Sequence, residues 1–309
     1  MKMIADFIDS ERVEGQYLIG NVSKGVNSIG SSYFSLELRD ASGTIIAKRW
    51  DAKPEDDQIF LTGNVISVVG DTNRYRDVLQ LKILSAEVVP AEKVDATRFV
   101  KAAPISKDEL VLRFNEHLAK IRNEDCLKIL NYMVEKFGDK LFYYPAAVSI
   151  HHEYSSGLLM HSIIMADIAA FLAPLYDVDR DLIVTGCLLH DLGKIIELEG
   201  PIVFRFSLEG KLFGHICIMS AEIKKAAELL KIESEVPLVL AHMILSHHGQ
   251  YEYGSPVLPL TKEALLLSFI DNLDSKMTIV DKALSDVEEG DFSNRIFALD
   301  NRSFYKPKI

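Results

Sequence analysis

Cysteine is scarce in this sequence, and its scarcity excludes a disulfide framework. The 309 residues contain three cysteines, Cys126, Cys187 and Cys217, which are far apart and set among apolar residues. Proteins held together by disulfides usually carry an even number of cysteines at short spacings. We therefore predict three reduced thiols in the protein core.

Long apolar runs and a signal sequence are also missing. No stretch approaches the ~20 apolar residues that cross a bilayer. The amino-terminal residues MKMIADFIDSERVEG lack the apolar core of a signal peptide. We therefore expect a cytoplasmic protein with no membrane partner.

Positive charge is in deficit, with 34 Lys and Arg against 45 Asp and Glu, and the net charge is -11. This balance argues against a protein that coats duplex nucleic acid through a general basic field. A local basic groove remains compatible with it, as do bound divalent cations that offset the acidic charge.

The first ninety or so residues contain short runs that alternate apolar and polar residues, the pattern of β-strands. Turn signals such as Gly25 and Gly70-Asp71 separate them. Five strands in so short a segment predict a small closed barrel of the OB type over residues 1–90. The expected strands are 17–22, 33–39, 44–50, 64–69 and 78–84.

Alternation along 33–39 points Phe34, Leu36 and Leu38 into the barrel and Tyr33 to the other face. Aromatic side chains interleaved with cations are typical of sites for single-stranded nucleic acid. Exposed tyrosines and arginines are also common on loops that bind nothing. The predicted nucleic-acid-binding residues are Tyr33, Arg49, Trp50, Arg74 and Tyr75.

A charged segment at 91–106 suits a linker, and the period is helical after it. Ser106-Lys-Asp-Glu109 matches an N-terminal capping box. An all-α domain is therefore expected over 107–309, which makes the fold class multidomain α+β. Its further helices are expected at about 124–138, 157–175, 179–196, 215–231, 235–248 and 261–287.

Histidine is concentrated in this helical domain, because eight of the nine histidines lie between His151 and His248. Imidazole is the side chain most used for proton transfer and for binding borderline metals. A single buried histidine is usually a core residue with satisfied hydrogen bonds. An ordered set of histidines and carboxylates favours a metal site instead, and here it comprises His161, His190-Asp191, His215, His247-His248 and Asp271.

Two divalent ions can be accommodated by this set, with Asp191 bridging them through its two oxygens. Two metals ~3.5–4 Å apart can hold a hydroxide and neutralise a phosphoryl group that is attacked in line. The first ion would take His161, His190, Asp191 and Asp271, and the second would add His215, His247 and His248.

Several motifs carry a resemblance to a known family. They are Ile150-His-His-Glu-Tyr-Ser-Ser-Gly-Leu-Leu-Met-His161, His190-Asp-Leu-Gly-Lys194, Gly214-His215, His242-Met-Ile-Leu-Ser-His-His-Gly249 and Asp271-Asn-Leu-Asp-Ser-Lys-Met277. Their order is similar to that in two-metal members of the HD superfamily of metal-dependent phosphohydrolases. With the OB-like domain in front, the chain resembles the YhaM family of 3'-to-5' exoribonucleases. Ser156 and Met160 stand where we expect a glycine and a glutamate.

The resemblance implies the two ligand sets given above and manganese as the preferred ion, with iron, Co2+ and other divalent ions as alternatives. Asp191, Lys194 and His152 are the expected catalytic residues. Lys194 would face substrate phosphate, or alternatively would oppose a helix dipole. His152 would orient phosphate or close the cavity, or would cap or pack. Asp274 would hold a ligand histidine, contact ribose or be solvated, and neither His117 nor His242 is an expected ligand.

We therefore predict an enzyme that hydrolyses single-stranded RNA, and single-stranded DNA as well, from the 3' end to nucleoside 5'-monophosphates by a two-metal hydroxide attack. One rival is an HD-type nucleotide or cyclic-dinucleotide phosphohydrolase. Another is an OB-based nucleic-acid-binding protein with an inactive HD domain. The sequence leaves the oligomeric state open and allows a homo-oligomer.

Overall fold

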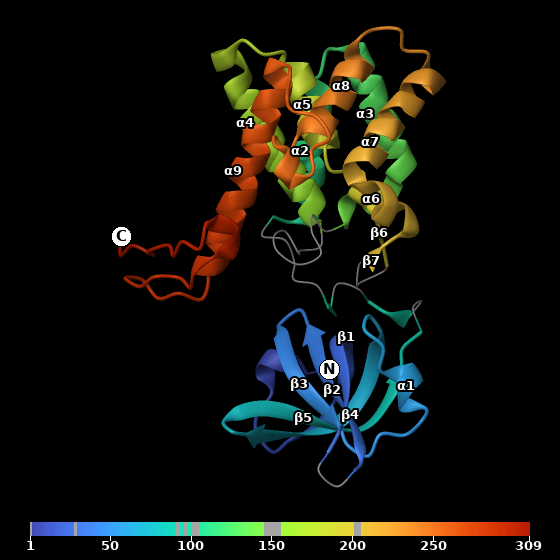
Figure 1. The fold of residues 1–309 in the computed structure, drawn as a ribbon, viewed down its shortest axis with the longest axis vertical. Coiled ribbons are helices and arrows are strands. Elements are labelled where there is room, and N and C mark those ends of the chain that lie inside the picture. Colours follow the sequence, from blue (N-terminus) through green and yellow to red (C-terminus); the bar gives the residue numbers. More distant parts are fainter. Residues whose placement is uncertain are drawn as a thin grey trace. The chain divides into compact units, whose positions relative to one another are not determined.

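The computed structural model describes residues 2–309 except 28–29, 91–92, 96–97, 100–104, 145–155 and 201–204. The chain forms two compact units, Met1–Ala102 with Gly200–Phe204, and Ala103–Glu199 with Arg205–Ile309. The first is a β-barrel and the second is helical (Figure 1). The multidomain α+β fold class is confirmed. The domain boundaries predicted at residues 90 and 107 stay predictions.

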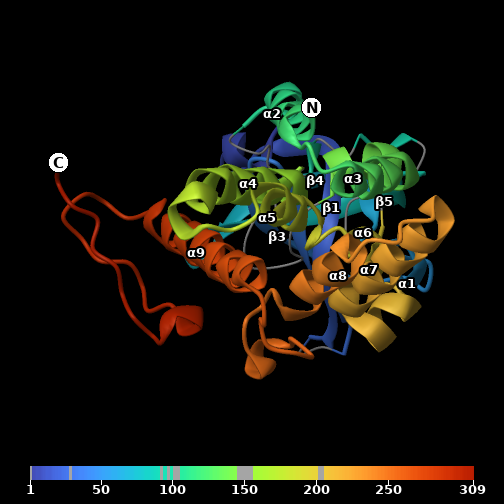
Figure 2. The same ribbon diagram turned by 90° about the horizontal axis from the view of Figure 1, so that it is seen from above.

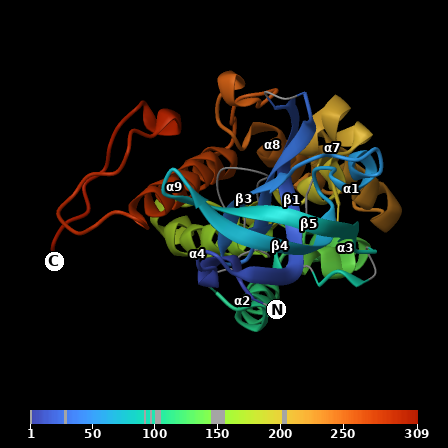
Figure 3. The ribbon, with the colours of Figure 1, turned by 90° about the horizontal axis from the view of Figure 1, so that it is seen from below.

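Five strands close the barrel in the order β1-β2-β3-β5-β4 (Figure 3). Neighbouring strands are antiparallel except β3 and β5, which are parallel. The first strand pairs with β4 through its beginning and with β2 through its end, and its register shifts between Ile19 and Asn21. The closed five-stranded barrel agrees with the predicted OB type. The elements are η1 (Ile4–Asp6), β1 (Arg12–Val26), β2 (Ser32–Asp40), β3 (Gly43–Arg49), α1 (Asp56–Ile59), β4 (Val65–Tyr75) and β5 (Val78–Val88).

Strand alternation builds the barrel core. Phe34, Leu36 and Leu38 of β2 are buried in one cluster, while Tyr33 and Arg39 lie on the other face. Burying a leucine or phenylalanine side chain contributes roughly 1.5–3 kcal/mol. The predicted assignment of faces along this strand is confirmed.

A second, smaller apolar cluster lies on the outer side of the barrel. Leu18 and Val65 contact Val89 and Phe99, with Val94 packed beside them. Leu18 can face outward because it alternates with Tyr17 and Ile19, which belong to the main core. Two residues of the predicted linker, Val94 and Phe99, therefore pack against the barrel.

The helical unit is arranged around α5 (Figure 2). This helix contacts α3, α4, α8 and α9, and residues 183–189 are all buried. A helix that is apolar all round belongs in a core. The elements are α2 (Lys107–Lys120), α3 (Glu124–Phe137), η4 (Gly138–Phe142), α4 (Gly157–Tyr176), α5 (Arg180–Leu189), α6 (Lys194–Glu197), β6 (Leu198–Glu199), β7 (Arg205–Phe206), α7 (Leu208–Leu230), α8 (Val236–Ser246), η5 (Tyr251–Tyr253), α9 (Lys262–Leu284) and η6 (Phe297–Leu299).

The predicted helix starts at Ser106 and Thr261 are present as hydrogen-bonded caps. Ser106 Oγ accepts from the backbone N–H of Glu109 at 3.3 Å, and Thr261 Oγ1 accepts from that of Ala264 at 3.1 Å. Each cap satisfies a backbone donor that the first helical turn leaves free.

Two predicted helices differ from the structure in their bounds. The helix expected at 179–196 is interrupted, because α5 ends at Leu189 and α6 begins at Lys194. The helix expected from 215 begins at Leu208 and is kinked at Gly214, which has φ 68° and ψ 156°. Both breaks lie beside predicted metal ligands.

The apolar helix α4 corrects the expectation that no stretch approaches membrane-spanning length. It has 20 residues and a mean hydropathy of 1.9, which suffice by length and composition to cross a bilayer. However, 56% of that segment is buried inside the protein. Its contacts with α5 and α9 explain the apolar composition without a membrane.

The three cysteines are free, but they differ in burial. Cys126 and Cys187 lie in the core as predicted, whereas Cys217 is exposed on α7. The predicted core position of Cys217 is wrong because Ile216 and Ile218 on either side of it face the core and leave it outside.

Residues 285–309 form an arm that leads away from the end of α9 in all three ribbon views (Figure 1). Bridges between Phe292 and Tyr305 and between Ile296 and Arg302 fold the arm back on itself. Lys306 Nζ donates to two main-chain carbonyls near the end of α9, at 3.2 and 2.7 Å. The aromatic ring of Phe297 nevertheless stays 87% exposed.

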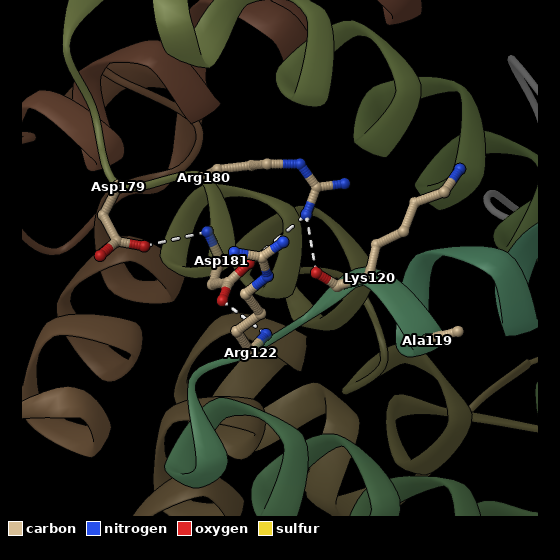
Figure 4. Close-up of a pocket in the computed structure, with 6 residues that line it drawn as sticks. All are labelled: Ala119, Lys120, Arg122, Asp179, Arg180 and Asp181. Atoms are coloured by element: carbon tan, nitrogen blue, oxygen red, sulfur yellow. Dashed lines mark hydrogen bonds and ion pairs between the residues drawn. The ribbon is translucent and has the colours of Figure 1, made fainter.

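A surface cavity of about 620 Å³ opens where the end of α2, the segment before α3 and the start of α5 meet (Figure 4). It is lined by Ala119, Lys120, Arg122, Asp179, Arg180 and Asp181. Its carboxylates are used within the fold. Asp179 caps α5, and Asp181 accepts from the backbone N–H groups of Arg122 and Asn123. The cavity lies at the opposite end of α5 from His190, about 15 Å away at 1.5 Å per residue.

Candidate metal centre and nucleic-acid interface

The seven predicted metal ligands converge in the helical unit. His161 comes from α4, His215 from α7 and Asp271 from α9, while the pairs His190-Asp191 and His247-His248 follow the ends of α5 and α8. The ligand atoms form two groups, and within each group all of them lie within 4.8 Å of one another. One group is His161, His190 and Asp191, and the other is His215, His247 and His248.

Asp191 lies between these two groups. Its Oδ2 is 3.3 Å from His190 Nε2 and 3.9 Å from His161 Nε2. Its Oδ1 is 3.3 Å from His215 Nε2 and 3.8 Å from His247 Nε2. Asp271 joins the first group, with Oδ1 3.3 Å from His161 Nε2. One carboxylate therefore presents one oxygen to each group, the arrangement expected of a bridging ligand.

Each ligand imidazole is held through Nδ1, which leaves Nε2 for the centre. His190 bonds to the carbonyl of Cys187 at 2.8 Å, His247 to that of Ile244 at 2.7 Å and His248 to that of Tyr253 at 2.6 Å. The other two bond to carboxylates, His161 to Asp274 at 2.6 Å and His215 to Glu197 at 3.2 Å. Such outer partners fix the tautomer and orientation of metal-binding histidines.

Three inward atoms are buried and have no hydrogen-bond partner among the described residues: Asp191 Oδ1, His215 Nε2 and His247 Nε2. A buried polar atom without a partner costs about 1–3 kcal/mol, and more when it is charged. All three atoms belong to residues predicted to hold the second ion, with Asp191 as the ligand shared with the first. A divalent cation would satisfy them together, so the residues present fit a metal.

The electrostatics favour the protonation states that bind metals. Burial alone would raise the pKa of Asp191, but Lys194 and His190 lower it well below its usual range. Burial together with His248 and His190 lowers the pKa of His247 well below that of free histidine. Both groups are therefore held with a free lone pair, an ionised carboxylate and a neutral imidazole.

The first group contains one imidazole with the opposite tendency. Burial would lower the pKa of His161, but hydrogen bonds to Asp271 and Asp274 raise it to about 9. Burial would likewise raise the pKa of Asp271, whereas the bond to His161 and the nearby His190 lower it. These two carboxylates make the surroundings of His161 strongly attractive to positive charge, whether a proton or a metal ion carries it.

Two glycines allow α7 to place His215 beside Asp191. Gly214 has a positive φ of 68°, a conformation that favours glycine, and it turns the chain immediately before His215. A Cβ atom on Gly193 would lie 2.2 Å from the carbonyl oxygen of His215. Gly193 stands in the break between α5 and α6, and its small size permits this close approach of α7.

Lys194 lies on the first turn of α6, and its Nζ donates to Asp191 Oδ2 at 2.7 Å. Its side chain is mostly buried, so it contributes positive charge directly at the centre. Contact between Lys194 and a substrate phosphate stays a prediction.

Four of the nine histidines lie outside the predicted ligand set. His151 and His152 lie outside the described residues. His117 is buried on α2, where its Nε2 is 2.8 Å from Asp167 Oδ1, and His242 Nε2 accepts from the backbone N–H of Leu260 at 2.9 Å. Neither of these two is among the grouped ligand atoms.

Glu197 is a site residue that the sequence reasoning missed. Its Oε1 accepts from the backbone N–H of His215 at 3.0 Å as well as from the ring. Burial would raise the pKa of Glu197, but these bonds to His215 lower it. The available signal was a carboxylate standing between Ile196 and Leu198, where a solvated position is not expected.

The predicted nucleic-acid residues of the barrel do not form one cluster. Tyr33 and Trp50 lie together, with ring centroids 5.0 Å apart and Lys48 Nζ 5.3 Å from the Tyr33 ring. Arg74 and Tyr75 lie at the β4–β5 turn. The strand register places Lys48 of β3 level with Lys82 of β5 and with Asp71 of β4. Tyr75 lies four residues beyond Asp71 on β4, which at 3.3 Å per residue is about 13 Å along the strand from the level of Lys48.

Arg49 is engaged within the barrel. Its Nε bonds to Asp56 at 3.1 Å and its Nη1 to the carbonyl of Leu84 at 2.6 Å. It still borders a groove of about 530 Å³ with Trp50, and two cations that the sequence reasoning missed, Lys53 and Lys82, border it too. Strands 2 and 3 form the ligand face of OB-folds, so Tyr33, Lys48 and Trp50 occupy the expected side.

Comparison with known proteins gives a family for both the helical unit and the whole chain. Residues 158–276 match the HD domain. The chain is 45% identical to the 3'-5' exoribonuclease YhaM of Geobacillus sp. over 99% of this chain and 95% of that protein. It is 44% identical to the protein of the same name from Bacillus velezensis over 96% of this chain and 95% of that protein.

Among solved structures, this chain is similar to the second OB-fold domain of replication protein A from Methanococcus maripaludis. The match covers 30% of this chain and 98% of that domain, with 14% identity and a TM-score of 0.25. The OB assignment rests on the number and order of the strands.

Replacing Glu197 with glutamine is expected to weaken Mn2+ binding about 10- to 100-fold, because the ring and backbone of His215 lose a charged acceptor. Isothermal titration of the metal-free protein with MnCl2 measures this affinity. Glu199→Gln is the matched control, since that side chain is 58% exposed. Equal affinities of the two variants would show that His215 binds metal without help from Glu197, or does not bind it.

Proposed function

The chain belongs to the YhaM family of 3'-5' exoribonucleases, and from this premise we propose that it hydrolyses single-stranded RNA, and single-stranded DNA as well, to nucleoside 5'-monophosphates. The observation that carries the proposal is the position of Asp191, with one oxygen toward each group of imidazoles. Such a centre suits phosphodiesters, because two metal ions can stabilise both the attacking and the leaving oxygen.

We propose two divalent ions, with Mn2+ preferred and iron, Co2+ or another divalent ion as alternatives. The mixed imidazole and carboxylate donors support such ions. One would be held by His161, His190, Asp191 and Asp271, and the other by Asp191, His215, His247 and His248. When bound, the ions supply activation of water and positive charge at the phosphoryl group.

The residues of the chain prepare this chemistry. The outer hydrogen bonds hold five imidazoles with Nε2 inward before substrate arrives, so little reorganisation is required. Lys194 adds a buried positive charge beside Asp191. Hydrolysis adds the oxygen of water to phosphorus and breaks the bond to the 3' oxygen, which takes a proton. The released nucleotide keeps a 5'-phosphate, and the shortened RNA keeps a 3'-hydroxyl.

The barrel would retain long substrates. The Tyr33 and Trp50 rings offer a surface on which bases can stack, and Lys48, Lys53 and Lys82 supply positive charge on an otherwise acidic protein. We also place the enzyme in the cytoplasm. The three free thiols, two of them buried, suit a reducing compartment.

We further propose that the protein forms a homo-oligomer through the arm at 285–309. On α9, Leu265, Phe269 and Leu273 are 46%, 61% and 50% exposed and lie on one helical face. The arm exposes Phe292 and Phe297 but is held in shape by its own bridges. Among the described residues, the α9 face and the arm both leave apolar side chains exposed, and a twofold pair of chains would cover them by placing each arm against the partner.

Purified protein with Mn2+ is expected to shorten 5'-labelled single-stranded RNA from its 3' end and to release nucleoside 5'-monophosphates. Chelator should stop the reaction, and Asp191→Ala should slow it by more than about 100-fold, because the variant lacks the ligand shared by both ions. Asp139→Ala, an exposed carboxylate of η4, is the control. Cleavage of mononucleotides or cyclic dinucleotides alone would support a phosphohydrolase, and RNA binding without cleavage would support a binding module.

Trp50→Ala and Tyr33→Ala are expected to raise KM for long RNA about 10-fold while leaving hydrolysis of a dinucleotide unchanged, because base stacking contributes about 1–3 kcal/mol per base. Ile8→Ala, which alters another exposed apolar side chain of the same unit, should change neither. Equal losses on long and short substrates would contradict a separate retaining role for the barrel.

The oligomer has its own test in light scattering of the full chain during size-exclusion chromatography. Phe297→Ser is expected to lower the mass to that of a single chain, because it places a polar group in the apolar contact. Leu112→Ser on α2, at a side chain that is 55% exposed, should leave the mass unchanged. A monomeric wild-type chain would refute this assembly.

A further inference from the structure

The ligands of the metal centre differ in exposure, and the difference shows from which side a substrate can approach. The side chains of His161, His190, Asp191 and His247 are at most 4% exposed. Those of His215 and Asp271 are each 14% exposed, and His248 is also only partly buried. Within the described part of the chain, the centre is therefore open on the side of His215, His248 and Asp271.

A short turn carrying two tyrosines is attached to this open side. The turn η5 has the sequence Tyr251-Glu252-Tyr253 and begins three residues after His248. The carbonyl oxygen of Tyr253 is the acceptor for His248 Nδ1 at 2.6 Å. One hydrogen bond thus separates the backbone of Tyr253 from a ligand imidazole.

The turn is held in a fixed conformation by its own backbone. The N–H groups of Tyr253 and Ser255 donate to the carbonyl of Gln250 at 3.2 and 3.3 Å, and that of Gly254 donates to the carbonyl of Tyr251 at 3.0 Å. Gly254 has a φ of 94°, which closes the turn. The side chains of Tyr251 and Tyr253 are nevertheless each 61% exposed, so their rings are not used to build the core.

We infer that Tyr251 and Tyr253 form a stacking surface for the base at the 3' end of the substrate. This inference rests on the proposed exonuclease function and names residues that select the substrate at that site. Protein sites for single-stranded RNA stack unpaired bases on aromatic side chains, and stacking tolerates every base because each has a π-face. A ring on a rigid turn beside a ligand holds the terminal base, so that the phosphodiester next to it reaches the centre.

Tyrosine is a suitable residue for stacking at this position. A tyrosine side chain provides a large flat surface at a low cost in side-chain entropy. The carbonyl oxygen of Tyr253 accepts from His248 Nδ1, so the backbone of this tyrosine lies beside the centre. Glu252, on the same turn and also exposed, has no ring on which a base can stack.

The experiment compares two 5'-labelled single-stranded RNAs that differ only in whether the 3'-terminal nucleotide carries a base. Tyr251→Ala and Tyr253→Ala remove a ring each, while Tyr251→Phe and Tyr253→Phe keep it. Glu252→Ala is the matched control on the same turn. Initial rates give kcat/KM for the first cleavage, and titration with MnCl2 shows whether His248 still binds metal.

We expect each alanine variant to lose about 10-fold in kcat/KM on the complete RNA and nothing on the RNA with the abasic end. The phenylalanine variants and Glu252→Ala should behave as wild type, and Mn2+ affinity should be unchanged throughout. Equal losses on both RNAs, or a loss of Mn2+ affinity, would show that the turn only supports His248 and would overturn the inference. Unchanged rates on both RNAs would overturn it too. If the wild type shortened neither RNA, the exonuclease proposal would fail first and this inference with it.

Discussion

A buried carboxylate among imidazoles is the constraint on which the helical unit depends. Asp191 is 3% exposed, and Lys194 reaches only its Oδ2, so that Oδ1 stays without a hydrogen bond among the described residues. An uncompensated buried charge is strongly destabilising, and such groups are normally paired or bound to metal. The centre is therefore structural as well as chemical, since the helices that supply its ligands must close around charge that needs compensation.

The outer hydrogen bonds of the histidines show how the protein meets this constraint. Three imidazoles are held by main-chain carbonyls, which are weak and general acceptors. The other two are held by carboxylates, Asp274 for His161 and Glu197 for His215. Each group of ligands thus contains one histidine whose outer partner carries a negative charge. A carboxylate partner raises the basicity of the imidazole it holds, so both groups gain the same kind of donor.

Much of this structure could be predicted from the sequence because local patterns specify it. Strand alternation predicts the buried face of Phe34, Leu36 and Leu38, and the order of the histidines and carboxylates along the chain indicates a metal site. Patterns along the chain do not show which distant groups meet. For that reason the bond from Glu197 to His215 was missed, and the internal pairing of Arg49 with Asp56 could not be distinguished from a free cation.

Other differences arise because two environments give the same sequence signal. Cys217 stands among apolar residues, yet neighbours on a helix point in different directions, and it faces outward. Ser156 has a left-handed conformation, with φ 68°, at the position where we expected a glycine, the residue that adopts this conformation most readily. The kink at Gly214 depends on a φ value that one glycine permits but does not require.

The position of Trp50 allows the barrel to be followed by intrinsic tryptophan fluorescence. It is the one tryptophan in the sequence and lies just beyond the end of β3, against the ring of Tyr33. The helical unit contains tyrosines but no indole. Emission excited at the red edge of the indole absorption band therefore comes from the barrel alone. Binding of RNA to the barrel can thus be followed without an added label, and the helical unit contributes no tryptophan signal.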